Sequence, residues 1–212
     1  MRLGLFGGTF NPIHFGHLRA AEEVADDLDL DRLLFIPAAR PPHKNTQAIT
    51  PFTVRLEMLS LAVAGHPLFE VSDIENLRPE KSYSVETLRL FRRDYGPGAE
   101  LYFIVGLDAM LEIETWREFR EIFTLCHLVV LDRPGYDPAD LAAFLHRKVK
   151  CTYQDEARVY LHPSGNRIYF RLITRLDVSS SLIRRLAAQG LSLRYLLPEA
   201  VRRYILENKL YS

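Results

Sequence analysis

A stretch near the N-terminus combines glycines and histidines in an order suited to binding phosphate groups: Gly7-Gly8-Thr9-Phe10-Asn11-Pro12-Ile13-His14-Phe15-Gly16-His17. Paired glycines let the backbone approach a ligand closely and expose amide donors, and a helix that follows adds unpaired N–H groups and the positive end of its dipole. His14 and His17 stand three positions apart, so helical geometry would place both imidazoles on one side, with Gly16 leaving room for a ligand between them. The stretch predicts a phosphate site with two imidazole donors.

This stretch does not match several better-known motifs. It lacks the third glycine of the dinucleotide fingerprint, which disfavours a nicotinamide-dependent oxidoreductase, and it lacks the Gly-Lys-Ser/Thr ending of a P-loop. The histidine pair also lacks the His-Glu-x-x-His arrangement of zinc proteases. A Gly-Gly turn before a helix and single histidines are common structural features, so this segment alone leaves a structural role open.

A second candidate anion site lies far along the chain, at Val178-Ser179-Ser180-Ser181-Leu182-Ile183-Arg184. Hydroxyl groups at the start of a helix cap it while its free amides face a phosphate. On such a helix, Arg184 shares a face with Ser180 and Ser181, where a guanidinium would pair with the same anion. The alternative is a serine-rich cap followed by a solvated arginine.

Together the two segments resemble the nucleotidyltransferases that transfer AMP or CMP onto a phosphate. The first is similar to their Gly-Gly-Thr/Ser-Phe-Asx-Pro-x-His-x-Gly-His signature, and the second to their Ile-Ser-Ser-Thr-x-x-Arg segment, with Ser181 in place of threonine. The resemblance implies a Rossmann-like doubly wound sheet, contacts from His14 and His17 to the phosphates of a nucleoside triphosphate, and assistance by Mg²⁺.

Over its whole length the chain resembles the bacterial nicotinate-nucleotide adenylyltransferases. Pro41–Lys44 is similar to their Pro-x-His-Lys loop, whose lysine approaches the ATP phosphates. Tyr83–Leu88 is similar to their Tyr-Thr-x-Asp-Thr-Leu segment, where backbone amides receive the nicotinate carboxylate. Gly106–Ala109 with Trp116 resembles their Gly-x-Asp…Trp stretch, and Asp132–Tyr136 matches a turn whose arginine meets the mononucleotide phosphate.

Individual residues in these segments also have structural alternatives. Asp108 follows a strand and would accept from ribose hydroxyls, or it would cap a helix. Trp116 offers a ring for stacking on a pyridine, or it is a core aromatic. Arg133 is either a phosphate ligand or a surface charge before a turn. Arg117 departs from the resemblance, because relatives often have an aromatic residue at that position.

The resemblance implies transfer of AMP from ATP to nicotinate mononucleotide, giving nicotinate adenine dinucleotide and pyrophosphate in NAD synthesis. The alternatives are another acceptor, either nicotinamide mononucleotide or phosphopantetheine, and a module that senses ATP or NAD without turnover. The implied catalytic residues are His14, His17, Lys44 and Arg184; the implied ATP contacts are Gly7, Gly8, Thr9, Phe10, Gly16, Gly106, Asp108, Ser180 and Ser181; and the implied mononucleotide contacts are His43, Ser84, Trp116 and Arg133. No residue is expected to hold a metal, because Mg²⁺ would be held mainly by the nucleotide.

The elements that must position these residues follow from hydrophobic periodicity. Short apolar runs alternate with amphipathic stretches, a pattern typical of an α/β fold with a mainly parallel sheet, helices on both faces and a helical C-terminal end. The expected strands are Arg2–Phe6, Arg32–Pro37, Leu68–Val71, Leu101–Val105, Leu128–Leu131, Val159–Leu161 and Tyr169–Ile173. The expected helices are Gly16–Leu28, one capped by Thr50 with Pro51 in its first turn, one opened by Ser84, Trp116–Leu125, one opened by Asp137-Pro138, Val178–Gln189 and Pro198–Leu206. Ala38–Thr50 has no periodicity and is a candidate lid loop.

Composition sets the wider limits. With 212 residues, 48% of them hydrophobic, the chain is predicted to form one globular domain over residues 1–212 rather than a disordered segment. Lys plus Arg number 27 and Asp plus Glu number 27, which gives no global field for nucleic acid or a membrane. No apolar run is long enough to span a bilayer. Cys126 and Cys151 suit ordinary buried thiols in a reducing cytoplasm, so a cytoplasmic enzyme of small molecules, monomeric or homo-oligomeric, is expected.

Overall fold

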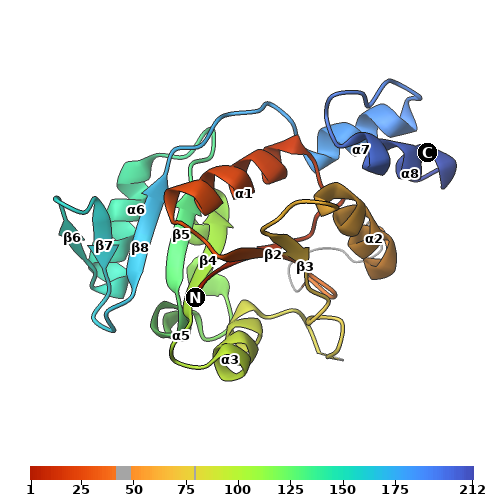
Figure 1. The fold of residues 1–212 in the computed structure, drawn as a ribbon. Coiled ribbons are helices and arrows are strands. Elements are labelled where there is room, and N and C mark those ends of the chain that lie inside the picture. The colour runs from red at the N-terminus through yellow and green to blue at the C-terminus, as the bar shows by residue number, and fades with distance from the viewer. Residues whose placement is uncertain (42–48, 79) are drawn as a thin grey trace.

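A sheet of eight strands forms the centre of the computed structural model, which describes residues 1–41, 49–78 and 80–212 (Figure 1). The strands are β1 Arg2–Gly8, β2 Arg32–Pro37, β3 Phe69–Val71, β4 Glu100–Gly106, β5 His127–Leu131, β6 Thr152–Gln154, β7 Val159–Leu161 and β8 Arg167–Arg171. Their order is β3-β2-β1-β4-β5-β8-β7-β6. Neighbours from β3 to β8 run parallel, and β7 and β6 each pair antiparallel, which confirms a mainly parallel sheet.

The strand order reverses between β1 and β4. The chain continues from β1 to β2 on one side, while β4 pairs with the other side of β1. In open α/β sheets ligands bind in the crevice beyond the carboxyl ends of the strands at such a reversal. The fold therefore directs attention to the segments that follow Gly8 and Gly106, the last residues of these two strands.

Helices cover both faces of the sheet, as the alternating pattern predicts (Figure 1). One face packs against α1 Phe15–Asp27, α2 Phe52–Val63, α7 Ser180–Ala188 and α8 Glu199–Glu207. The other face packs against α3 Ser84–Tyr95, α4 Leu107–Leu111, a 3₁₀ turn at Ile113–Thr115, α5 Phe119–Leu125, α6 Pro138–Phe144 and a π turn at Leu145–Val149. Alternate strand residues serve the two cores: Phe35 faces the first and Leu34 the second.

Some helix starts match the sequence and others do not. Ser84 opens α3, and the Asp137 side chain caps α6 by accepting from the amide of Ala139 at 2.8 Å. The predicted cap of α2 is wrong, because Pro51 itself is the N-cap residue and the Thr50 carbonyl accepts from Arg55.

The predicted helix at Trp116–Leu125 is wrong in its first turn. Trp116 has an extended backbone that ends the 3₁₀ turn, and Glu118 has φ 50°, in the left-handed region. A non-glycine residue in that conformation interrupts a right-handed helix, so α5 starts only at Phe119. The short α4, which follows β4 directly, has no periodic signal in the sequence because it spans little more than one turn.

The C-terminal third contains further differences. β6 was not predicted, and β8 lies two residues earlier than the expected Tyr169–Ile173 because its ladder with β5 ends at the pair Leu131 and Arg171. The hydroxyl of Ser179 accepts from the amide of Leu182, so α7 begins one residue after its cap.

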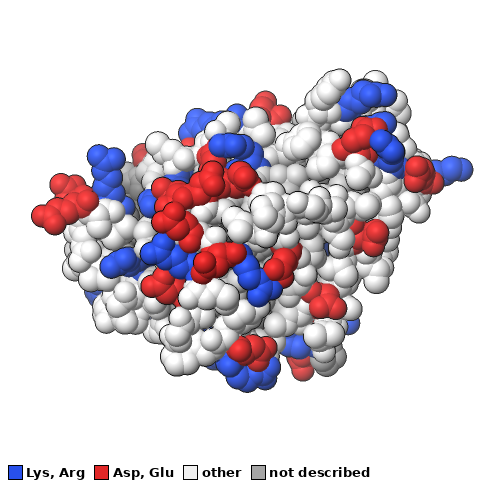
Figure 2. Space-filling view, viewed as in Figure 1, with Lys and Arg blue, Asp and Glu red and all other residues white. Residues whose placement is uncertain are grey.

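Three further features concern the surface charges, the two cysteines and the length of the helices. Figure 2 shows acidic and basic side chains interspersed over the face in view. Cys126 and Cys151 are free and buried, as the sequence predicts. Among the helices of the described residues, none has the length and apolar character needed to cross a membrane.

Candidate active site

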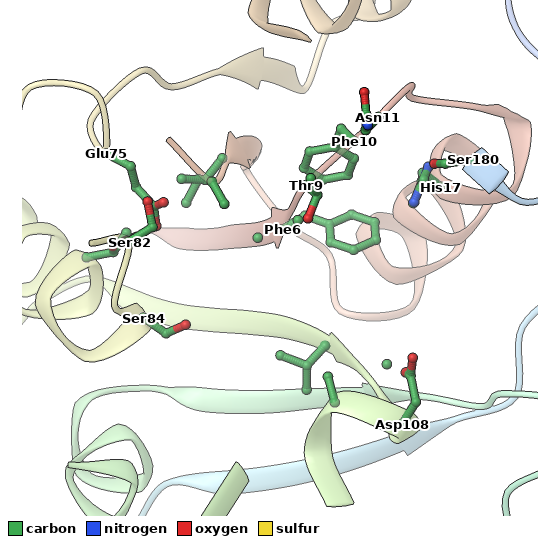
Figure 3. A pocket seen from close by; sticks show the side chains of 18 of the residues that line it. Phe6, Thr9, Phe10, Asn11, His17, Glu75, Ser82, Ser84, Asp108 and Ser180 are labelled. Carbon is green, nitrogen blue, oxygen red and sulfur yellow. Dashed lines mark hydrogen bonds between the residues drawn. The ribbon is translucent and has the colours of Figure 1, made fainter. Parts of the chain in front are cut away.

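A cavity of about 590 Å³ opens beyond the carboxyl ends of β1 and β4 (Figure 3). Its walls come from the segment after β1, the start of α3, the β4–α4 junction and the start of α7. Predicted site residues that line it are Gly7, Gly8, Thr9, Phe10, His17, Ser84, Gly106, Asp108, Trp116, Arg133, Ser180 and Arg184. The fold thus gathers into one cavity most of the residues that the motifs single out.

His14 and His17 stack on one another, with ring centroids 3.7 Å apart and planes 28° apart. Helix α1 begins at Phe15, so His14 is its N-cap residue rather than part of the helix. His14 and Gly16 line a small cavity of about 60 Å³ that adjoins the main one and shares His17 and Arg133 with it. The predicted pairing of the two imidazoles on one side is confirmed.

Burial, followed by the nearby positive charge of Arg133, lowers the pKa of His14 to about 4. The ring is therefore neutral near pH 7, and it can donate one hydrogen bond but adds no positive charge. Its Nδ1 atom is buried and has no hydrogen-bond partner within the described ranges. Burial thus limits the part that the sequence predicts for His14, a phosphate donor, to a neutral hydrogen-bond donor.

The space beside Gly16 is occupied by other residues of the protein. A Cβ atom at this position would lie 3.1 Å from Nδ1 of His14 and 3.2 Å from a methyl carbon of Val178. The space expected to admit a ligand between the two histidines is therefore filled by the His14 ring and by the segment before α7. This glycine allows α1 and that segment to pack closely around the histidine pair.

The start of α7 is hydrogen-bonded to the turn after β1. The Ser180 hydroxyl donates to the carbonyl of Pro12 at 2.8 Å, and Nη1 of Arg184 donates to the carbonyl of Asn11 at 2.7 Å. From the end of the chain, the Tyr211 hydroxyl donates to Oδ1 of Asn11 at 3.0 Å. A guanidinium has five N–H donors, so this bond leaves Arg184 capacity for a phosphate. The two sequence motifs therefore form one site.

Ser181 lies differently from its neighbours. Its side chain is exposed and does not line the cavity, and its hydroxyl lies 3.2 Å from that of the cap residue Ser179. The structure thus brings Ser180 and Arg184 to the cavity and leaves Ser181 at its outside.

The β4–α4 junction brings a carboxylate and a guanidinium together. Oδ1 of Asp108 lies 3.5 Å from Nε of Arg133, and both side chains are about half exposed. A Cβ atom on Gly106 would lie only 2.3 Å from the Asp108 oxygen and 2.8 Å from Nε of Arg133. A side chain at this position would therefore displace the Asp108–Arg133 pair from its place over the end of β4.

The other end of the cavity is formed by the first turn of α3 and by Trp116. Ser84 is the first residue of α3, and the amides of a first helical turn have no partner within the helix. Trp116 is half-buried and packs edge-to-face on Phe103, with centroids 6.4 Å apart. Glu75 and Ser82 lie beside Ser84 in Figure 3, on the side away from His17 and Ser180.

Sequence reasoning missed Glu75, which is buried and accepts a hydrogen bond from the Thr87 hydroxyl at 2.8 Å. It also missed Ser82, which exchanges two hydrogen bonds of 3.0 Å with the backbone of Arg40. Neither has a local signal, since both lie in an irregular segment before α3.

Sequence reasoning also missed Arg55, which is almost fully buried. Its guanidinium donates to the carbonyls of Thr50, Thr9 and Ala38 at 2.8–2.9 Å, so it joins the turn after β1 to both ends of the predicted lid loop. A signal existed, because Arg55 stands three positions before Met58 and therefore on the apolar face of α2.

Two predicted residues, His43 and Lys44, lie outside the described residues. The described ranges contain no group of three or more histidine, cysteine or acidic side chains that could hold a metal ion. The two carboxylates that line the cavity, Glu75 and Asp108, lie at different ends of it (Figure 3). These side chains do not fit a metal held by the protein alone.

Comparison with known proteins identifies the family. A family profile described as cytidylyltransferase-like matches residues 5–186. Two relatives named probable nicotinate-nucleotide adenylyltransferase, from Geobacter metallireducens and Geobacter sulfurreducens, are each 49% identical over 100% of this chain and 99% of their own length. The chain belongs to the nicotinate-nucleotide adenylyltransferase family. The family predicted from the motifs is therefore confirmed.

A solved structure shows that this family member shares its fold with a distant protein. The nicotinic acid mononucleotide adenylyltransferase of Plasmodium falciparum, complexed with NaAD, matches with a TM-score of 0.75 at 17% identity, over 99% of this chain and 97% of that chain. The match confirms the predicted Rossmann-like fold.

Proposed function

We propose that this protein transfers AMP from ATP to nicotinate mononucleotide, giving nicotinate adenine dinucleotide and pyrophosphate. The observation that carries the proposal is the single cavity that joins a phosphate-binding end, with His17, Ser180 and Arg184, to an end formed by Ser84 and Trp116. Such a cavity suits two nucleotides bound with their phosphates in contact. The names of the full-length relatives support this choice of substrates.

The reaction needs no covalent intermediate. A phosphate oxygen of the mononucleotide attacks the α-phosphorus of ATP in line, and the bond to the bridging oxygen breaks, so that pyrophosphate leaves with the electron pair. Positioning the two anions and stabilising the leaving charge supply most of the catalysis. His17 and Arg184 suit that role at the ATP phosphates, assisted by Lys44, and neutral His14 supplies a hydrogen bond.

The acceptor half has matching groups. Arg133 lies beside the histidine pair and suits the mononucleotide phosphate. On the ATP side, Asp108 suits ribose hydroxyls. The start of α3 at Ser84 suits the nicotinate carboxylate, since a helix N-terminus favours an anion. Trp116 suits the pyridine ring, and His43 is also predicted at this substrate. Magnesium enters as part of the Mg-ATP substrate, and we place the enzyme in the cytoplasm, where two free thiols persist.

The test is pyrophosphate release by the purified protein with Mg-ATP and, in parallel, nicotinate mononucleotide, nicotinamide mononucleotide or phosphopantetheine, with products identified by mass. A strong preference for nicotinate mononucleotide is expected. The variant His17→Ala serves as the control for a contaminating activity, because it removes a phosphate donor from this site. Turnover of another acceptor alone would overturn the proposed acceptor, and ATP binding without turnover would identify a sensing module.

A further inference from the structure

The corner that carries Trp116 is tied to α3 by a set of charged side chains outside the cavity. This corner consists of Trp116–Glu118, between the 3₁₀ turn and α5, and it includes the left-handed backbone of Glu118. Such a conformation is unfavourable for a residue with a side chain and persists where neighbouring contacts hold it. Helices α3 and α5 lie side by side below the sheet in Figure 1, so α3 is within reach of the corner.

Arg117 makes contacts in two directions. Its guanidinium lies over the ring of Tyr83, 5.1 Å from the centroid, and Tyr83 is the N-cap residue of α3. The same guanidinium lies 3.8 Å from Glu86 of α3 and 3.2 Å from its chain neighbour Glu118. One side chain therefore spans from the corner to the first turn of α3.

Arg89 of α3 reinforces this connection. It lies 3.0 Å from Glu86 and 2.9 Å from Glu121 of α5, and it hydrogen-bonds Glu118. Hydrogen bonds from Arg89 hold the pKa of Glu118 below its usual range. The planar, forked guanidinium suits several carboxylates at once in a way that a lysine ammonium does not.

We propose that Arg117 is a positioning residue that, together with Arg89, fixes Trp116 relative to the first turn of α3 and so sets the width of the acceptor end of the cavity. The proposal rests on the proposed function for the identity of the acceptor. Arg117 does not line the cavity and its side chain is half exposed, so it acts through Tyr83, Glu86 and Glu118 rather than by touching the substrate.

The sequence offers a direct readout, because Trp116 is the only tryptophan in the chain. Acrylamide quenching of its fluorescence in the ligand-free protein reports how well the corner is held, independently of any turnover. Arg117→Met removes the charge and the planar group, and Arg117→Lys keeps the charge alone. Arg93→Met is the matched control, since Arg93 lies on α3, is exposed and forms its ion pair with its chain neighbour Asp94, away from the corner.

Both Arg117 variants are expected to show increased quenching of Trp116 and a KM for nicotinate mononucleotide raised about 3- to 10-fold, the size of an exposed ion pair plus a cation–π contact. The KM for ATP and the behaviour of Arg93→Met should match wild type. Unchanged quenching in Arg117→Met, or wild-type behaviour of Arg117→Lys, would overturn the proposal. A parallel rise in the KM values for nicotinate mononucleotide and ATP would also overturn it. So would an equal change in quenching and KM in Arg93→Met.

This design separates the two proposals. If the wild-type protein fails to convert nicotinate mononucleotide, the proposed function fails, while quenching of the ligand-free variants still decides whether Arg117 holds Trp116. If the wild-type protein turns over and quenching is unchanged in Arg117→Met, the positioning role alone fails. Thermal melts of each variant establish that the comparison is made on folded protein.

Discussion

At the scale of single residues, the histidine pair shows how burial changes what a side chain does. His14 is buried and neutral, while His17 is half-buried, lines the main cavity and packs edge-to-face on Phe10 at 5.1 Å. The pair thus combines an inner ring that shapes the site with an outer ring that faces the ligand. His17 is the better placed of the two to contact a phosphate.

Replacing His17 by alanine tests that placement. Loss of one donor to charge that develops on the phosphates should lower kcat roughly 10²–10³-fold. The fold should stay intact because the ring lies at the edge of the core rather than inside it. Steady-state pyrophosphate release at saturating substrates measures the effect, and a cooperative thermal melt checks the fold. Near-normal turnover would exclude His17 from the phosphate site.

The lowered pKa of His14 predicts how the free energy of unfolding depends on pH. Its pKa is about 4 in the folded protein and about 6.5 when unfolded, so between these values the unfolded chain binds a proton that the folded protein does not. The free energy of unfolding should therefore fall as pH drops through this window, by about 3 kcal/mol in total from this group. Urea unfolding at pH 7 and pH 5 measures the upper part of the fall, about 2 kcal/mol.

His14→Gln provides the comparison for that experiment. Burial also lowers the pKa of His127 and His162, so the wild-type slope includes those groups as well. The variant lacks the His14 contribution alone and should lose less stability on acidification than wild type. Equal losses in the two proteins would show that His14 does not titrate in this way.

At the scale of elements, the site depends on segments that are joined by hydrogen bonds to backbone carbonyls. Ser180 and Arg184 fasten α7 to the turn after β1, and Arg55 fastens α2 to that turn and to the end of β2. Carbonyls with fixed positions need donors of fixed geometry, which a guanidinium supplies. These contacts hold the cavity walls at set distances.

Arg55→Met is the sharpest test of this arrangement. Methionine fills the buried volume but leaves three carbonyls without their donor, which should lower the free energy of unfolding by about 2–4 kcal/mol. The turn that includes Thr9 should also shift, raising the KM for ATP. Urea denaturation and kinetics measure the two effects. Arg203→Met, at an exposed position, is the control, and an equal loss there would contradict a special role for Arg55.

At the scale of the whole molecule, the cavity is built from parts of the chain that are far apart in sequence. Its lining extends from Phe6 to Arg184, so a nucleotide bound there would meet the first strand, the middle of the sheet and α7 at once. A ligand that binds only the folded state stabilises it by mass action. Substrate binding should therefore raise the melting temperature of the molecule as a unit.

Mg-ATP at about 100 times its Kd should add about 2.7 kcal/mol to the free energy of unfolding, with a single melting transition retained. A thermal melt with and without the nucleotide measures this. Magnesium chloride alone is the control, since the described residues offer no cluster for a free metal ion. An equal rise with magnesium alone would contradict a site that binds the ion with its nucleotide.

Local patterns determined much of this protein. Apolar runs and caps located the central strands and most helices, because strand and helix periodicity depend on neighbouring residues. The motifs from Gly7 to His17 and from Val178 to Arg184 pointed to the family and to the phosphate-binding end of the cavity. Prediction from the sequence was wrong where the fold overrides the local preference for helix, as at Glu118, whose left-handed backbone delays the start of α5 to Phe119.

Only the tertiary structure decided how these pieces work together. It filled the space at Gly16 with the His14 ring, neutralised that ring by burial, and directed Ser180 and Arg184 to the turn after β1 while leaving Ser181 outside. It also revealed the carbonyls that Arg55 joins and the contact of Arg117 with Tyr83. These features depend on contacts between residues distant in sequence. Burial, distance and charge at such contacts are properties of the packed chain, and no local pattern encodes them.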